Sequence, residues 1–416
     1  MFSRQLPSTL LILLMALAGP AWAQSPADHE AEERLVLETD ADLSLAGALE
    51  AALARAPGAA LVAAQAGLAD TYRQRAGSWL AGAPSAQLRY LSDRWQTRQG
   101  LSEAEFGFEL PLWRPGQRQA LAGEAGASRA LAGEAARLHR WQLAGLVREH
   151  YWELREARER LSLAQAELAS FRQLEAEVRA RVAAGDAAPA EVLSAEGLRR
   201  EREAAVHEAE VVLADRHYAW RVLTGLSALP AERVETVTAT PGDYLPLLAA
   251  RAARDQAEAA LAAARREGAG APRLLLGLRQ DQQDGAETTD SVSAQLSLPF
   301  GGSSHRQARL APLELEAARA ADELRRQQQE AELAQHEAEH ELHAREVALA
   351  DSQGRYALAS QELALARRAY GLGESALVER LLSEIRAAEA GRVQQLSRLA
   401  LARAIARYNQ VHGVLP

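Results

Sequence analysis

Two stretches of the chain keep a helical pattern for far longer than a compact domain needs. They run from about residue 116 to 184 and from about residue 304 to 370, and both are rich in Ala, Leu, Glu and Arg. At a rise of about 1.5 Å per residue, each predicted helix is on the order of 100 Å long. Aromatic residues make up only 5% of the chain, so the composition indicates extended helices rather than large compact cores.

Both stretches carry a heptad seam, in which apolar residues recur at every seventh position. In the second stretch the seam consists of Leu342, Leu349, Tyr356, Leu363 and Tyr370. In the first stretch the corresponding residues are Leu154, Leu161, Leu168, Glu175 and Val182. Such a seam predicts that the helices pack side by side over their whole length.

The chain repeats itself at an offset of 188 residues, which is the separation of Pro111 from Pro299. The same offset relates Pro84 to Pro272, Gly185 to Gly373 and Gly225 to Gly413. Prolines and glycines mark the places where a local pattern breaks, so these matches weigh more than matches between the abundant Leu and Glu residues. The offset therefore predicts a duplicated structural unit.

Each unit is predicted to contain a helix, two strands, a very long helix, a glycine-marked turn and a second long helix. The first unit covers 43–225, with strands at about 85–95 and 103–111 and a helical hairpin at about 116–224. A linker at 226–242 leads to the second unit at 243–413, with strands at about 273–281 and 290–299 and a hairpin at about 303–412. The first helices of the two units are expected at about 58–81 and 246–268.

The predicted strands have one apolar and one polar face. Apolar positions alternate with polar ones, and this period of two is that of a strand. The apolar positions are Leu88, Tyr90, Phe106, Phe108, Leu276, Leu278, Leu296 and Leu298. A soluble sheet packed on a core has this pattern, and so does a membrane β-barrel with lipid outside and water inside. The strand length, and the absence of another element to cover the apolar face, favour the barrel. Four strands cannot close a barrel, so several chains must contribute.

The N-terminus has the features of a secretory signal peptide. Arg4 precedes an apolar run from Leu10 to Leu17, and Ala21-Trp22-Ala23 predicts cleavage after residue 23. Residues 1–23 are therefore expected to be the signal peptide, and 24–42 an N-terminal tail. The chain has no cysteine, so neither disulfides nor a lipid-bearing cysteine are expected. A net charge of −9 without a basic block argues against nucleic acid as a partner.

Short motifs in this order resemble those of the TolC-like outer-membrane efflux proteins. They are LSLAGAL at 43–49, LPLW at 110–113, AGD at 184–186, LPFGG at 298–302 and YGLGES at 370–375. The resemblance covers the whole mature chain and implies a mainly α fold with a membrane β-barrel. A homotrimer would share one 12-stranded barrel in the outer membrane and one α-helical tunnel across the periplasm. Its implied partners are outer-membrane lipid, a periplasmic adaptor and an inner-membrane pump.

The implied function is passive conduction of solutes such as drugs or metal cations. We find no phosphate-binding glycine loop, HExxH, CxxC or nucleophile elbow, so neither enzymatic activity nor a cofactor is expected. A channel of a type I protein secretion system is an alternative within the same family. A periplasmic coiled-coil tether or adaptor is an alternative of another class, and a secreted hydrolase is the weakest interpretation.

The resemblance also places a periplasmic gate at the helical turns. Gly185 and Asp186 mark the first turn, and Gly373 and Glu374 mark the second. The tip tyrosine of the family matches Tyr370, which is expected to latch the closed state by bonding a neighbouring helix. Relatives narrow the tunnel with acidic rings just after the second turn. Glu379 matches the first ring, whereas Leu382 replaces the second acidic residue, which puts a double ring in doubt.

Three histidines are weak candidates for a metal site. His336, His340 and His343 recur on one side of the second long helix, in a spacing that can present imidazoles to a cation. Their equivalents in the first unit are Arg148, Trp152 and Arg155, which are not typical ligands. A solvated polar face is the simpler interpretation, and no metal is predicted.

Overall fold

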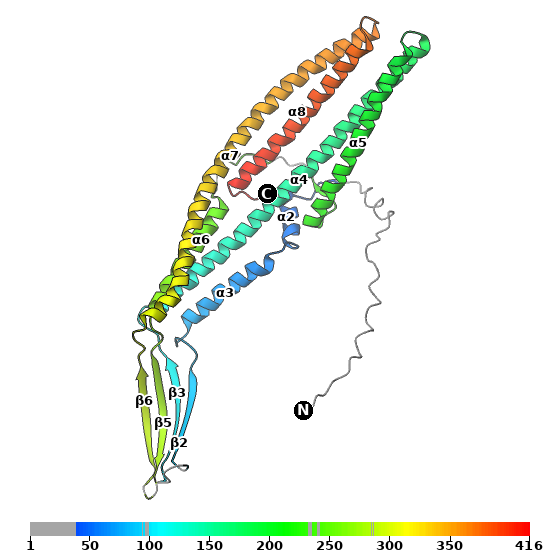
Figure 1. Cartoon of the computed structure of the whole chain (residues 1–416). Coiled ribbons are helices and arrows are strands. Elements are labelled where there is room, and N and C mark those ends of the chain that lie inside the picture. The colour runs from blue at the N-terminus through cyan, green and yellow to red at the C-terminus, as the bar shows by residue number, and fades with distance from the viewer. Residues whose placement is uncertain are drawn as a thin grey trace, which may run out of the picture.

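A computed structural model describes residues 39–93, 95, 100–231, 235–238, 242–283, 285 and 287–416. The predicted signal peptide at 1–23 and the tail up to residue 38 lie outside these described residues. The described chain is an elongated body with a small sheet at one end and the turns of two helical hairpins at the other (Figure 1). The structure is mainly helical, as the sequence predicts.

The helices and strands alternate in a regular order. The helices are α2 (Leu45–Leu53), α3 (Ala59–Gly77), α4 (Gln117–Ala184), α5 (Pro189–Thr224), α6 (Leu245–Glu267), α7 (Ser303–Gly371) and α8 (Leu377–Val411). The strands are β1 (Thr39–Asp40), β2 (Ser85–Ser92), β3 (Ser102–Pro111), β4 (Leu229–Pro230), β5 (Arg273–Gln282) and β6 (Thr289–Ser297). The order helix, strand, strand, long helix, long helix occurs twice, although a common origin of the two units stays a prediction.

Two differences from the expected helices have identifiable reasons. The helix expected to reach residue 81 ends at Gly77. There the Arg118 guanidinium donates to the carbonyl oxygens of Ala76 (3.0 Å) and Gly77 (3.2 Å), which satisfies the free carbonyls of a helix end. The short helix α2 was not expected as a separate element. Ser44 caps it, since its hydroxyl accepts a hydrogen bond from the Gly47 amide at 3.0 Å.

The long helices form a single layer in which α4 is central. α4 packs against α5 on one side and α8 on the other towards the tip, and against α3 and α6 towards the sheet. α7 packs on α6 and then on α8, so α5 and α7 lie at the two edges of the layer near the tip (Figure 1). No helix in the described part of the chain is both long enough and apolar enough to cross a membrane.

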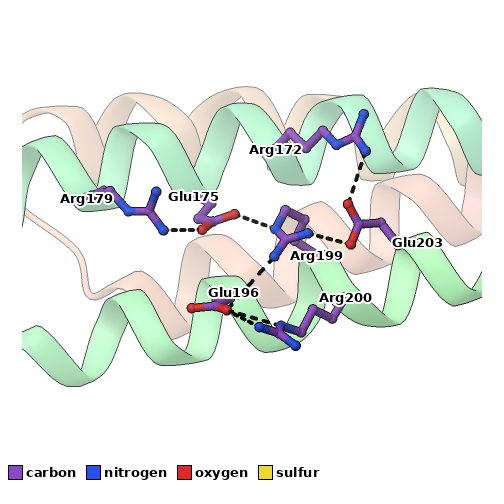
Figure 2. A network of polar contacts seen from close by, with 7 residues as sticks. All are labelled: Arg172, Glu175, Arg179, Glu196, Arg199, Arg200 and Glu203. Carbon is purple, nitrogen blue, oxygen red and sulfur yellow. Dashed lines mark hydrogen bonds and ion pairs between the residues drawn. The ribbon is translucent and has the colours of Figure 1, made fainter.

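Three seam residues of α4 are buried, including its one charged member, whereas Leu161 and Val182 are half-buried. Glu175 is only 7% exposed, and Figure 2 shows it between Arg179 of α4 and Arg199 of α5. Its carboxylate oxygens lie 2.5 Å from an Arg179 nitrogen and 2.7 Å from an Arg199 nitrogen. The same network continues through Glu203, whose pKa is lowered by hydrogen bonds from Arg172 and Arg199. Paired in this way, a charge can occupy a seam position that is otherwise apolar.

The middle of the molecule contains the main core. Trp220 of α5, Tyr151 and Leu154 of α4 and Leu49 of α2 are almost completely buried there. The indole of Trp220 donates to the Ala228 carbonyl at 3.1 Å, which anchors the segment between the two units. This contact holds Ala228, near the start of the linker, against α5.

Next to this core, Arg148 of α4 is 3% exposed and binds three separate segments. It makes a bidentate pair with Glu235 of the linker at 2.9 and 2.7 Å. It also donates to the Gln410 side chain at 2.5 Å and to the Val414 carbonyl at 2.8 Å. Asn409 completes the cluster by donating to Glu235 at 3.0 Å.

Both hairpins turn through the same backbone motif. At the first turn the Gly185 amide donates to the Val182 carbonyl and the Asp186 amide to the Arg181 carbonyl. At the second turn the amides of Gly373 and Glu374 make the equivalent bonds one repeat later. This is the Schellman motif, which needs a residue with positive φ after the helix. Gly185 and Gly373 supply it, with φ of 84° and 77°.

We predict that Arg148→Met destabilises the protein by about 3–5 kcal/mol, because it leaves the Glu235 carboxylate buried without its partner. Arg160→Gln is the matched control, since it removes an exposed pair with Glu156 that is worth about 0.3–0.5 kcal/mol. The measurement is thermal unfolding followed by far-ultraviolet circular dichroism. Equal shifts for the two variants would contradict a central role for Arg148.

Gly373→Ala is expected to destabilise the tip by about 1–2 kcal/mol, because alanine is strained at positive φ. Gly371→Ala, only two residues away, should cause no loss, since no atom outside the local helix lies within 4 Å of an added Cβ at either position. Amide hydrogen exchange at the end of α7 measures the difference. The prediction fails if both substitutions leave exchange at the parent rate.

Candidate functional site in the sheet and the helical tip

The four long strands form one antiparallel sheet in the order β2-β3-β5-β6. β3 and β5 join the strand pair of the first unit to that of the second. Leu88 lies opposite Phe106, Phe106 opposite Leu278, and Leu278 opposite Val292. Directly paired residues share a face, so the apolar residues of both strand pairs lie on the same face of one sheet.

That apolar face is uncovered. The residues predicted to form it are all exposed: Leu88, Tyr90, Phe106, Phe108, Leu276, Leu278, Leu296 and Leu298. Exposure reaches 78% at Leu88 and 65% at Leu278. Leu298 lies one residue beyond the end of β6. A contiguous apolar surface of this kind marks contact with lipid, another protein or another apolar phase.

The opposite face carries a network of charges. Near the loop end, Arg279 lies 3.0 Å from the Glu103 carboxylate and 2.9 Å from that of Asp281. Near the helix end, Glu109 accepts from Gln87 at 2.9 Å and pairs with Arg273 at 3.2 Å. Apart from the Arg279–Asp281 pair within β5, these interactions cross from strand to strand, so they hold the sheet together on a face that water can reach.

The junction between strands and helices depends on Arg114, which sequence reasoning missed. Its guanidinium donates to the Gly270 carbonyl at 2.7 Å and to the Pro299 carbonyl at 2.8 Å. Arg114 follows β3, so it ties the end of the first strand pair to the segment just before β5 and to the segment just after β6. The equivalent residue in the second unit is Gly302, so the repeat contained no signal for this contact.

The helical tip brings some of the predicted gate residues together but not all. Tyr370 is buried at 3% exposure in a cluster with Phe171, Leu174 and Leu377. Gly185, Asp186, Gly373 and Glu374 lie at the exposed turns. Glu379 is exposed in the first turn of α8, where a carboxylate is favourable at the positive end of the helix dipole. Leu382 is also exposed.

Five charged residues at the tip were not predicted. Arg181 and Glu177 come from α4, and Arg380 and Glu384 come from α8. Arg380 and Glu384 are 8% and 6% exposed, and Arg367 of α7 binds both oxygens of Glu384 at 2.8 Å. The hydrogen bond to Glu384 raises the pKa of Arg367. The burial of Arg380 and Glu384 depends on contacts between segments that are far apart in the sequence. The local sequence pattern does not encode such contacts.

The three histidines do not converge on a common point. The rings of His336 and His340 lie 5.2 Å apart, whereas Nδ1 of His343 is 3.8 Å from a carboxylate oxygen of Glu346. All three are exposed on α7. Within the described ranges, no group of three or more His, Cys, Asp or Glu residues is arranged to hold a metal ion.

No protein-family model and no curated protein sequence matches the chain. Solved structures match it over most of its length. The outer membrane protein VceC from Vibrio cholerae has a TM-score of 0.70 at 17% identity, and the match covers 89% of this chain and 96% of VceC. The CmeC outer membrane channel of Campylobacter jejuni has a TM-score of 0.68 at 13% identity, covering 99% and 94%.

A membrane protein from Pseudomonas aeruginosa has a TM-score of 0.71 at 19% identity, and the match covers 91% of each chain. The matches align about nine-tenths or more of each chain. The resemblance found in the motifs is thus confirmed at the level of structure. The chain has the fold of the TolC-like outer-membrane channels.

Proposed function

We propose that the chain is the outer-membrane channel of a tripartite efflux system and conducts solutes passively to the outside. The observation that carries this proposal is the sheet, which has one uncovered apolar face and one charged face and is joined directly to very long helices. A membrane barrel needs lipid outside and water inside. The chain performs no chemistry in this proposal, and drugs or metal cations are the solutes expected from the motif resemblance.

The sheet supports assembly with further copies of the chain. β2 and β6 each pair with a single neighbouring strand, so the outer edge of each has free backbone donors and acceptors. Free edges of this kind pair readily with other strands. Three copies of the four-stranded sheet would close a 12-stranded barrel in which every strand has two partners and no edge faces lipid, as a spanning barrel requires.

The helical layer supports the same assembly. On its outer edge, α5 exposes an apolar stripe of Leu193, Val211, Tyr218 and Val222. On the opposite edge, α7 exposes a stripe of Leu333, Val347, Leu358 and Leu365. Successive residues of a helix are about 100° apart around its axis, and at this spacing the four residues of each set fall on one face. Leu193 and Val211 are as far apart along α5 as Val347 and Leu365 are along α7, so the stripes match when α5 of one copy packs antiparallel to α7 of the next.

The gate of this channel lies at the hairpin turns. There the periplasmic adaptor and the inner-membrane pump would deliver solute. Three copies of Glu379 would form a carboxylate ring that favours cations and that multivalent ions can bind. The repeated order of elements supports a duplicated unit, so each chain contributes two similar hairpins to the tunnel. A periplasmic tether would leave the uncovered sheet face without a role.

We expect charged substitutions on the apolar face of the sheet to block assembly in the outer membrane. Leu278→Arg should cost about 2–4 kcal/mol near the middle of the bilayer, and heat-modifiable trimers should be lost from the outer-membrane fraction. Gln295→Glu on the charged face is the control. It should assemble normally and make the channel more cation-selective in planar bilayers. Equal tolerance of both substitutions, or a parent protein without conductance, would refute the channel.

The proposed contact between α5 of one copy and α7 of the next can be tested separately. Val211→Glu on α5 or Leu358→Glu on α7 should prevent trimer formation, because each places a charge on an apolar stripe without a partner. The helical content of the monomer should be unchanged. Glu339→Gln, at an exposed position of α7 away from the stripe, is the control. Size-exclusion chromatography with light scattering in detergent gives the oligomeric state. If both stripe variants still form trimers, the proposed contact between the α5 and α7 stripes is wrong.

A further inference from the structure

A cavity of about 670 Å³ lies between α4, α7 and α8, beside the middle of α4. Much of its wall is one side of α8, where Val393, Leu396 and Ala400 follow one another at intervals of three and four residues and so share a face. Sites for small molecules are concave, mostly apolar and about 300–1,000 Å³ in volume. The cavity therefore has the size and the apolar wall of such a site, and it lies away from both the sheet and the hairpin turns.

The indole of Trp152 on α4 borders this cavity and has no hydrogen-bond partner. Trp152 is 2% exposed, and its Nε1 is buried without an acceptor among the described residues. The indoles of Trp113, Trp141 and Trp220, by contrast, donate to backbone carbonyls at 3.1, 2.6 and 3.1 Å. Because buried donors in proteins are normally satisfied, the unused donor of Trp152 is an exception. The cavity that it borders is where an acceptor can be supplied.

Arg403 of α8 brings an unused cation to the same cavity. It is exposed, and it has no ion pair in the part of the chain that the structure describes. Two other arginines of the cavity differ in this respect. Arg148 is neutralised by Glu235 at 2.7 Å, and Arg407 pairs with Glu341 at 2.8 Å. An anion that enters the cavity therefore finds the charge of Arg403 available.

The acidic residues of the cavity do not all carry a free charge. Glu156 pairs with Arg160 at 2.6 Å. Glu341 also lies 3.6 Å from Arg345. Glu149 is exposed and has no ion pair among the described residues, so the cavity offers one free carboxylate beside one free cation, and charge alone does not select a ligand. The unused indole N–H does, because it can donate but cannot accept, and the polar group of the ligand must therefore be an acceptor.

We propose that this cavity binds a small amphipathic carboxylate. The apolar body of the ligand lies along the apolar side of α8, its carboxylate pairs with Arg403, and one of its oxygens accepts the hydrogen bond of the Trp152 indole. Water does not reach the indole nitrogen in the structure, so the ligand displaces side chains at the cavity wall as it enters, a common adjustment on binding. The site goes beyond the proposed channel function and does not require conductance.

The test uses dansylglycine, a probe that joins a fused aromatic ring to one carboxylate. Titrated into the full-length protein in detergent and followed by directly excited dansyl emission, it should bind saturably, one probe per chain. Partition into micelles rises linearly with probe and is subtracted. Arg403→Gln should weaken the saturable binding about tenfold, because a charge-assisted contact is lost. Trp152→Phe keeps an aromatic ring and should weaken it about fivefold, the effect of one neutral hydrogen bond.

Arg398→Gln is the matched control, since Arg398 is an exposed arginine of the same helix that does not line the cavity. It should bind the probe like the parent. Arg403→Gln changes only an exposed side chain, so it should keep the circular dichroism spectrum of the parent and decides the question even if Trp152→Phe fails to fold. Equal affinities of the Arg403 and Arg398 variants, or a parent without saturable binding, would overturn the site.

A probe of opposite charge tests the class of ligand. Dansylcadaverine carries the same ring on an ammonium group and should show only the linear partition into micelles. Glu149→Gln should strengthen dansylglycine binding about twofold, because it removes an exposed like charge. Saturable binding of dansylcadaverine that Glu149→Gln abolishes would mean that the cavity takes a cation, and the inference would be wrong. Binding without conductance would contradict only the channel, and conductance without binding only this site.

Discussion

The buried charge of Arg148 holds the two halves of the chain in register. Its partners come from the linker, from the end of α8 and from the C-terminal segment, so one guanidinium fixes the second hairpin relative to α4. A helix on the order of 100 Å long acts as a lever, and a small rotation at its middle would move the tip and the sheet by many ångströms in opposite directions. The position of the hairpin turns therefore depends on a contact far from them.

Local features of the fold were predictable because they depend on neighbouring residues. The alternation that ends at Pro111 and Pro299 predicted the strands and their apolar face, and Gly185 and Gly373 predicted the turns. Arg114, Arg148 and Arg380 were not predictable as key residues. Each is one arginine among many, and its importance comes from carbonyls and carboxylates that lie far away in the sequence. Glu175 is a charged residue in an otherwise apolar seam, and its partner Arg199 lies 24 residues further along the chain.

The two hairpins use the same turn but different means of packing. Both pair charges across their two helices, Glu175 with Arg199 in the first and Arg367 with Glu384 in the second. The second also brings its helices close at Gly391, where an added Cβ would lie 3.1 Å from the Tyr356 ring. A repeat of sequence therefore need not repeat the same packing contacts, and the offset in the sequence alone did not reveal this difference.

The uncovered sheet also makes a single copy of the chain prone to aggregate before it assembles. A lone copy carries two free strand edges and an apolar face, which are the features that lead to edge-to-edge aggregation. Gly107 and Gly277 lie opposite each other in its centre and contribute no side chains to hold the strands. The helices pack within one copy, whereas in the proposed assembly the sheet would gain most of its stability from partner copies. Its formation would then be a step whose rate rises with the concentration of chains, and holding proteins that shield the sheet in transit would protect it without touching the helices.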